Sequence, residues 1–248
     1  MAKIFSQAQM DEIYTYFKDK MNSLECIRTY EILPFAECTF SQIEKIVNAY
    51  YSGYLKLEEI QNVWNIGDEI EINTVSVSTM ESQPSQIIHY KIIDFEHDTL
   101  LDQINDKTKA LLTLAPTTKL TNNGIISSDY VNYPLSDRHK WLNNDYYNAL
   151  PEQFRNLIKT VNKSTNAGTF NAKVFLPSVK EITGNDTDYP FGGVRYDYYK
   201  NHDYPSQSWT RNPYNSNCYT YYWVNYGTTL NYSNPNGTYK GIVPHICL

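Results

Sequence analysis

The chain has 248 residues and a formal net charge of −6, with 27 acidic and 21 basic side chains. This length allows a sizeable hydrophobic core, and the negative charge argues against a nucleic-acid backbone or an anionic membrane as partner. No apolar stretch approaches the roughly 20 residues of a membrane-spanning helix, and the N-terminus lacks the apolar centre of a signal peptide. We therefore expect a protein that is made in the cytoplasm and does not insert into a membrane.

Two amphipathic helices are predicted near the N-terminus. In the first, Ser6 caps a run to about Asn22 whose apolar residues recur every three or four positions. In the second, Thr39 and Gln42 form a capping box that opens another such run. We expect residues 1–57 to be a helical segment for attachment or packing, whose apolar stripes face either the chain's own core or an intersubunit bundle.

From about Glu58 the apolar spacing becomes typical of strands, and we expect residues 58–248 to form one domain. The predicted strands are, in chain order, residues 64–72, 86–95, 110–116, 173–178, 208–211, 218–226, 228–232 and 239–244. The sequence therefore predicts an α+β fold whose antiparallel strands gather late in the chain.

A helix is predicted in mid-chain, from Trp141 to Leu150, followed by a further helical turn that reaches Val161. Trp141 and Leu142 are expected to anchor it on the sheet, because a large ring beside an apolar neighbour is typical of a helix laid on a core.

No pattern in the sequence predicts catalysis, a metal site or a cofactor. Glu96-His97-Asp98 carries acid–base groups, but we interpret it as a solvated strand end. Asn185-Asp186-Thr187-Asp188 is interpreted as a solvated turn, because it lacks the Gly and the distal Glu of a calcium-binding loop.

The four cysteines are too sparse for a zinc site or a disulfide framework. Cys218 and Cys247 either face each other across a sheet or, as we expect in a cytoplasmically made protein, remain buried thiols.

Residues 214–239 are mostly Tyr, Asn, Ser, Thr and Gly, the types that antibody paratopes use for contact area and adaptable hydrogen bonds. An AT-rich genome would also enrich Tyr and Asn, but such a bias acts along the whole chain, whereas Tyr clusters after Tyr189. We therefore predict a ligand-binding surface made by Tyr214, Tyr219, Tyr221, Trp223, Asn225, Tyr226, Tyr232 and Tyr239.

Strand alternation divides this region into two faces. It places Cys218, Thr220, Tyr222 and Val224 on one face, and Tyr219, Tyr221, Trp223 and Asn225 on the other. Because Cys218 and Val224 suit a core, we expect the face of Tyr219 to be exposed. The alternative is that its rings also pack within a small sheet.

Arg211 is predicted to be structural. Its five fixed donors suit the carbonyls of a neighbouring loop or a carboxylate such as Glu181, a geometry that Lys does not reproduce. Contact with a ligand is the alternative.

Seven short blocks follow one another in a fixed order along the chain. They are Thr39-Phe40-x-x-Ile43, Trp64-Asn65-Ile66-Gly67-Asp68, Ile92-Ile93-Asp94-Phe95-x-His97-Asp98, Ser136-Asp137-Arg138-x-x-Trp141-Leu142-Asn143 with Leu150-Pro151, Lys173-Val174-Phe175-Leu176-Pro177-Ser178-x-x-Glu181, Trp209-Thr210-Arg211-x-Pro213 and Gly241-x-Val243-Pro244-x-x-Cys247-Leu248. In this order they resemble the DUF6273 family of phage and bacterial proteins, over residues 39–248. That family is similar in turn to the C-type-lectin-like fold of formylglycine-generating enzymes and of variable proteins diversified by retroelements.

The resemblance implies a C-type-lectin-like domain with an antiparallel sheet, two helices and long loops, often carried on phage tail or fibre proteins. The chain lacks the Glu-Pro-Asn and Gln-Pro-Asp motifs of calcium-dependent sugar-binding lectins, and nothing in it clearly supplies the cysteine pair of formylglycine-generating enzymes. We therefore expect neither of those activities.

The expected function is that of a virion protein of a phage tail or fibre, which binds a host-surface receptor, protein or glycan, through its Tyr/Asn-rich face. The alternative is an assembly or decoration role on a neighbouring virion protein, and a homo-oligomer is compatible with either. An enzyme on the same fold is the rival class, and would require a close carboxylate pair or a reactive cysteine in a concave pocket.

Overall fold

The computed structural model describes residues 6, 10–16, 31–80, 82–185, 192–214, 221–227, 229–236 and 238–248. Its α-helices after residue 31 are α2 (Phe40–Tyr51), α3 (Leu57–Gln61), α4 (Asp137–Trp141), α5 (Tyr147–Ala149), α6 (Glu152–Arg155) and α7 (Val179–Thr183). The other helical segments are the 3₁₀ turns η1 (Phe35–Glu37), η2 (Tyr133–Leu135) and η4 (Tyr198–Lys200) and the π-helical η3 (Leu142–Tyr146).

The strands form three sheets, and every strand pair described is antiparallel, which confirms the α+β class. The five-stranded sheet has the order β1 (Glu69–Thr74), β2 (Gln86–Phe95), β5 (Leu112–Pro116), β12 (His245–Cys247) and β8 (Val174–Phe175). The four-stranded sheet has the order β4 (Lys107–Lys109), β3 (Thr99–Ile104), β6 (Val161–Thr165) and β7 (Gly168–Ala172). The three-stranded sheet has the order β11 (Thr229–Ser233), β10 (Tyr221–Tyr226) and β9 (Ser208–Pro213).

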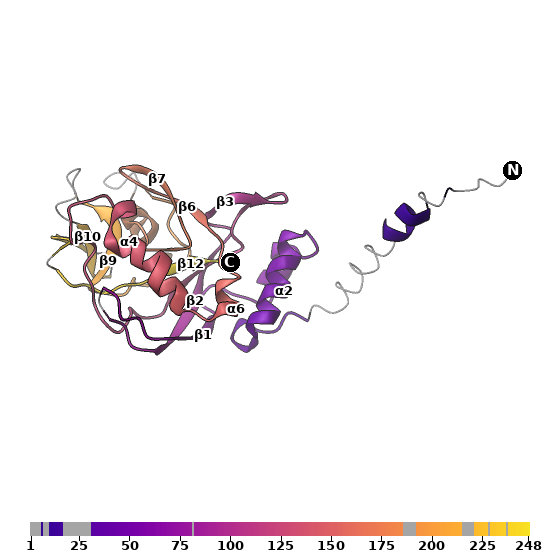
Figure 1. Cartoon of the computed structure of the whole chain (residues 1–248), viewed down its shortest axis with the longest axis horizontal. Coiled ribbons are helices and arrows are strands. Elements are labelled where there is room, and N and C mark those ends of the chain that lie inside the picture. Colours follow the sequence, from indigo (N-terminus) through magenta and orange to yellow (C-terminus); the bar gives the residue numbers. More distant parts are fainter. Residues whose placement is uncertain are drawn as a thin grey trace.

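Helix α2 lies at the opposite end of the body from β9 and β10 (Figure 1). Its predicted capping box is confirmed, because Thr39 and Gln42 exchange side-chain and backbone hydrogen bonds. Its buried face, which includes Ile43 and Val47, belongs to the same hydrophobic cluster as the five-stranded sheet. Tyr50 of α2 also donates to Glu96 at the end of β2. The apolar stripe of α2 therefore packs on the chain's own core.

The first predicted helix is confirmed over residues 10–16, and the rest of it lies outside the described residues. Its large apolar side chains are exposed, between 39% for Ile13 and 69% for Tyr14. Figure 1 shows this helix apart from the body. The proposed division into residues 1–57 and 58–248 stays a prediction.

The four-stranded sheet was not predicted, and the helical turn expected to reach Val161 is wrong. Helix α6 ends at Arg155, and Val161 begins β6, where it pairs with Leu100 and Ala172. Strand β6 buries alternate residues, but two of its inward side chains are Lys163 and Thr165. A polar inward face gives no hydrophobic alternation, which is the signal that sequence patterns detect.

The last predicted strand is misplaced. The apolar residues Ile242 and Val243 are fully buried, yet they precede the ladder, which begins at His245. Strand β12 then runs between β5 and β8 and pairs with both. Among the helices that the structure describes, none is long and apolar enough to span a bilayer.

The mid-chain helix runs from α4 through η3 to α5 and packs on the core as expected. Trp141 is 2% exposed and Leu142 is fully buried. The indole Nε1 of Trp141 donates to the carbonyl of Thr79 at 3.2 Å, and the guanidinium of Arg138 lies 4.8 Å from the ring centroid. Trp141 thus joins this helix to the loop that follows β1.

We predict that Trp141→Ala lowers the free energy of unfolding by about 3–5 kcal/mol, because it leaves a large cavity and an unpaired carbonyl. Urea unfolding followed by circular dichroism measures the change. Leu135→Ala is the control, since Leu135 is 63% exposed in the adjacent η2 turn and its loss should cost less than about 0.5 kcal/mol. Equal stability of the Trp141→Ala variant and the native chain would contradict this packing.

Candidate functional site

The structure separates the predicted ligand-binding residues into exposed and buried sets. Tyr219 lies outside the described residues. Those exposed to solvent are Tyr214, Asn225, Tyr226, Tyr232 and Tyr239. Tyr221 and Trp223 are buried, at 0% and 7% exposure.

The expected exposure of Tyr221 and Trp223 is wrong, because β10 is covered on both faces. Tyr221 and Trp223 belong to the main hydrophobic cluster, whereas Val224 on the opposite face belongs to a second cluster with Tyr204 and Val243. The hydroxyl of Tyr221 donates to the carbonyl of Val131 at 2.6 Å. Alternation along β10 separates the two faces correctly, but it does not reveal that hydrophobic clusters cover both of them.

Three tyrosines lie together on the face of β10 that also carries Val224, and we call Tyr214, Tyr222 and Tyr232 the aromatic platform. Tyr214 and Tyr232 are exposed, and Tyr222 is half-buried. Tyr222 and Tyr232 are register partners of β10 and β11. The rings of Tyr214 and Tyr232 stack with centroids 4.0 Å apart, and Tyr222 meets Tyr214 edge-on at 5.4 Å. Tyr214 and Tyr232 are 46% and 49% exposed. The platform therefore offers preorganised ring surface to solvent.

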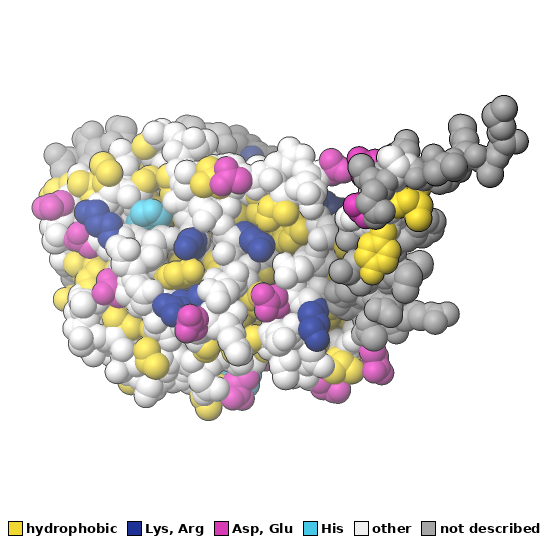
Figure 2. Space-filling model, turned by 45° about the vertical axis from the view of Figure 1, so that its right-hand side comes forward, with side chains coloured by type: hydrophobic (Ala, Val, Ile, Leu, Met, Phe, Trp, Pro, Cys, Tyr) yellow, Lys and Arg dark blue, Asp and Glu magenta, His cyan; other side chains and the backbone are white. Residues whose placement is uncertain are grey.

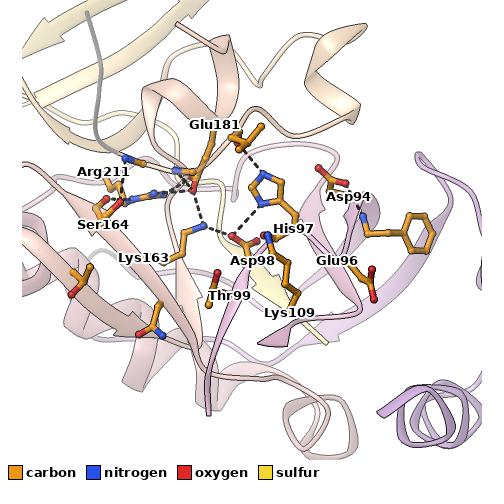
Figure 3. Close-up of a pocket in the computed structure, with 16 residues that line it drawn as sticks. Asp94, Glu96, His97, Asp98, Thr99, Lys109, Lys163, Ser164, Glu181 and Arg211 are labelled. Carbon is orange, nitrogen blue, oxygen red and sulfur yellow. Dashed lines mark hydrogen bonds and ion pairs between the residues drawn. The ribbon is translucent and has the colours of Figure 1, made fainter. Parts of the chain in front are cut away.

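A separate cavity of about 540 Å³ lies between the segments 94–99, 162–164 and 192–194. Four charged residues line part of this cavity. Lys163 lies between the carboxylates of Asp98 and Glu181, and Arg211 lies on the far side of Glu181 (Figure 3). We call Asp98, Lys163, Glu181 and Arg211 the buried charge network. Their side chains are at most 3% exposed.

The contact between Arg211 and Glu181 confirms that Arg211 is structural. Its Nη1 and Nη2 donate to the two carboxylate oxygens of Glu181 at 2.5 and 2.8 Å, and its remaining bonds go to the carbonyls of Ser164 and Leu176. Glu181 also accepts from the backbone of Ser178, in the capping box that starts α7. Burial would raise the pKa of Glu181, but the charges of Arg211 and Lys163 outweigh it and hold this pKa well below its usual range.

The carboxylate of Asp98 also has several hydrogen-bond donors around it. It accepts from Lys163, from the hydroxyl of Thr113 at 2.6 Å and from the hydroxyl of Tyr196 at 3.1 Å. Burial would raise the pKa of Asp98, but the positive charges of Lys163 and His97 keep it well below its usual range. Asp98 is therefore an ionised, fully bonded carboxylate.

The interpretation of Glu96-His97-Asp98 as a solvated strand end is therefore wrong. The side chain of His97 is 9% exposed, and its Nε2 hydrogen-bonds the carbonyl of Val194 at 2.9 Å. A carbonyl only accepts, so Nε2 carries a proton. Nδ1 lies 3.3 Å from Asp98 Oδ1 without hydrogen-bond geometry, and the two groups interact as an ion pair. Burial lowers the pKa of His97, but the nearby carboxylates of Asp98 and Glu181 raise it above its usual value overall.

Cys247 is a buried free thiol, as expected, and donates to Asp98 Oδ2 at 3.3 Å. Burial raises the pKa of this thiol well above its usual range, which makes it a poor nucleophile. Cys218 and most of the acidic turn at 185–188 lie outside the described residues. Within the described part of the chain, no group of three His, Cys, Asp or Glu side chains is placed to hold a metal ion.

The charge network was only partly visible in the sequence. The sequence named Glu181 as one possible partner of Arg211, beside the carbonyls of a neighbouring loop. Lys163 and Asp98 gave no signal, because nothing local places an inward Lys opposite an Asp in another strand. Since each carboxylate of the network has cationic and neutral donors of its own, the arrangement suits a structural tie between segments rather than proton transfer to a substrate.

A family model described as "Domain of unknown function (DUF6273)" matches residues 110–248. This stretch contains the last four of the seven blocks and ends with the chain. No curated protein and no solved structure matches the chain.

We predict that Glu181→Gln lowers the free energy of unfolding by about 3–5 kcal/mol, because Lys163 and Arg211 would keep their charges without the shared carboxylate. Chemical unfolding at neutral pH gives the value. Glu58→Gln makes the same chemical change at an exposed position of α3 and should cost less than about 0.5 kcal/mol. Similar losses in the two variants would show that the network adds nothing specific.

We predict that His97 gives stability a pH dependence. Because its pKa is raised in the folded chain, its contribution is complete below the unfolded value of about 6.5 and is lost as the pH rises through the folded pKa. The stability gap between the native chain and His97→Gln should therefore narrow from about pH 6 to about pH 8.5 in urea unfolding series. His89→Gln is the control, since that side chain is 52% exposed. A gap that does not change with pH would rule out a charged His97.

Proposed function

The chain belongs to the DUF6273 family, and we propose that it is a binding protein of a bacteriophage virion, in the tail or a fibre, that contacts a host-surface receptor. The contact surface in this proposal is the aromatic platform of Tyr214, Tyr222 and Tyr232. The observation that carries it is the stack of Tyr214 on Tyr232, whose side chains are both about half exposed.

The platform has the physical properties of an interface hot spot. Tyrosine presents a large amphipathic ring with few rotatable bonds, so fixing it on binding costs little conformational entropy. Stacking against a neighbour restrains the rings of Tyr214 and Tyr232 before a partner arrives. Asn225, Tyr226 and Tyr239 are exposed as well and remain candidates for the rim of the interface.

Tyr221 and Trp223 take a supporting role in this proposal. The indole Nε1 of Trp223 donates to Ser233 Oγ at 3.0 Å, which ties β10 to β11 behind the platform. The ammonium of Lys240 lies 3.7 Å from the Trp223 ring centroid and makes a cation–π contact with this ring. These contacts hold the strands that carry Tyr222 and Tyr232.

A C-type-lectin-like fold and a location in the virion are parts of the same proposal, and both rest on the family resemblance. An assembly role on a neighbouring virion protein would use the same platform. We favour binding over catalysis because the carboxylates next to the cavity, Asp98 and Glu181, are occupied by protein donors, and because Cys247 is deeply buried.

We predict that Tyr232→Ala and Tyr214→Ala weaken attachment to the host cell, with a loss of about 2 kcal/mol or more at the better position, while stability changes by less than about 1 kcal/mol. The measurement is flow cytometry of fluorescently labelled protein on a panel of bacterial strains, with a thermal melt of each variant.

Tyr54→Ala is the matched control, because Tyr54 is 46% exposed, the same as Tyr214, but lies between α2 and α3. Val224→Ala, in the second core, should instead lower the melting temperature. If both platform variants attach to the cells as strongly as the native chain does, the proposal is wrong.

A further inference from the structure

We propose that the ligand of the aromatic platform is a neutral saccharide, an uncharged chain with many hydroxyl groups and apolar C–H faces. This inference rests on the proposed function and specifies its receptor. It starts from the charge pattern around the platform.

The stretch of sequence that carries the platform contains no side chain that is charged at neutral pH. Residues 212–239 include no Asp, Glu, Lys, Arg or His, although the chain has 27 acidic and 21 basic residues in all. Elsewhere the charges are well spread, and on the face shown in Figure 2 acidic and basic side chains are interspersed. The stretch that supplies the platform is therefore an uncharged part of a charged chain.

The two cations that flank this stretch are engaged elsewhere. Arg211 is fully buried against Glu181. Lys240 lies over Trp223, on the opposite face of β10 from Tyr222, and donates to Gln207 Oε1 at 3.0 Å. Neither cation faces the ligand side of the platform.

A neutral surface disfavours a protein or an acidic polymer as the partner. A typical protein surface is about a quarter or more charged, and burying those charges against uncharged groups costs free energy that no counter-charge offsets. A phosphate- or carboxylate-rich polymer meets the same obstacle. A neutral saccharide has no charge to desolvate.

The groups on the platform match such a ligand in kind. The rings of Tyr214 and Tyr232 provide apolar area for C–H faces, and phenol hydroxyls both donate and accept. Beyond the end of β11, the side-chain amide of Asn234 donates to the hydroxyl of Tyr130 at 3.0 Å, and Tyr130 is itself 45% exposed. This contact places a further exposed ring and an amide beyond the end of β11, and their donors and acceptors suit hydroxyl groups.

The test uses bacterial cells to which the full chain attaches, treated in parallel with sodium periodate, which cleaves vicinal diols, or with a broad-specificity protease. We expect periodate to reduce attachment by about tenfold or more and protease to leave it unchanged. Attachment should also be nearly constant between roughly 50 and 500 mM NaCl, because no charge pair contributes to it. Soluble polysaccharide extracted from the same cells should inhibit attachment of the native chain. The concentration needed for half inhibition should be higher for Tyr232→Ala than for Tyr54→Ala.

Loss of attachment after protease treatment alone would overturn the saccharide and identify a protein receptor. A steep fall of attachment with rising NaCl concentration would show that the ligand is charged, and would contradict a neutral saccharide. In both cases a defect in Tyr232→Ala leaves the proposed function standing. If Tyr232→Ala and Tyr214→Ala attach like the native chain, the platform is not the binding surface, and both proposals fail together.

Discussion

The buried charge network is the constraint on which the rest of this structure depends, because it joins all three sheets. Lys163 comes from the four-stranded sheet and Arg211 from the three-stranded sheet, while Asp98 accepts from Thr113 of the five-stranded sheet. Glu181, at the start of α7, completes the set between the two cations. Opposite charges in a dry interior interact strongly only in their correct geometry, so the network fixes how the sheets meet.

This constraint reaches the surface through β9. Arg211 holds β9 from below, β9 pairs with β10, and β10 pairs with β11, which carries Tyr232. Two hydrophobic clusters bury Tyr221, Trp223 and Val224 of β10, so buried rings and charges support the strands that carry the platform. Under the proposed function, a surface supported in this way would lose little conformational entropy on binding.

Local patterns were sufficient for some elements and insufficient for others. The capping box of α2 and the whole of β2 could be placed from the sequence, because side chains a few residues apart determine them. Strand β6 could not, since its inward Lys163 is compatible with a core only when Asp98 and Glu181 lie opposite, and their approach is a property of the tertiary fold. Turn chemistry was also overlooked, as at Asn105, whose positive φ of 51° closes the β3–β4 hairpin.

The site shows the same division between local and tertiary information. Composition identified the Tyr/Asn-rich region, and donor geometry made Glu181 one of the possible partners of Arg211. Alternation along β10 then misassigned Tyr221 and Trp223, because a period of two separates faces without telling how many of them are covered. Arg211 is buried, where its bonds to Glu181 hold β9 to α7. The exposed side chains of residues 212–239 are uncharged rings, amides and hydroxyls. Under the proposed function, the exposed rings of the platform could therefore change without disturbing the contacts that hold the sheets.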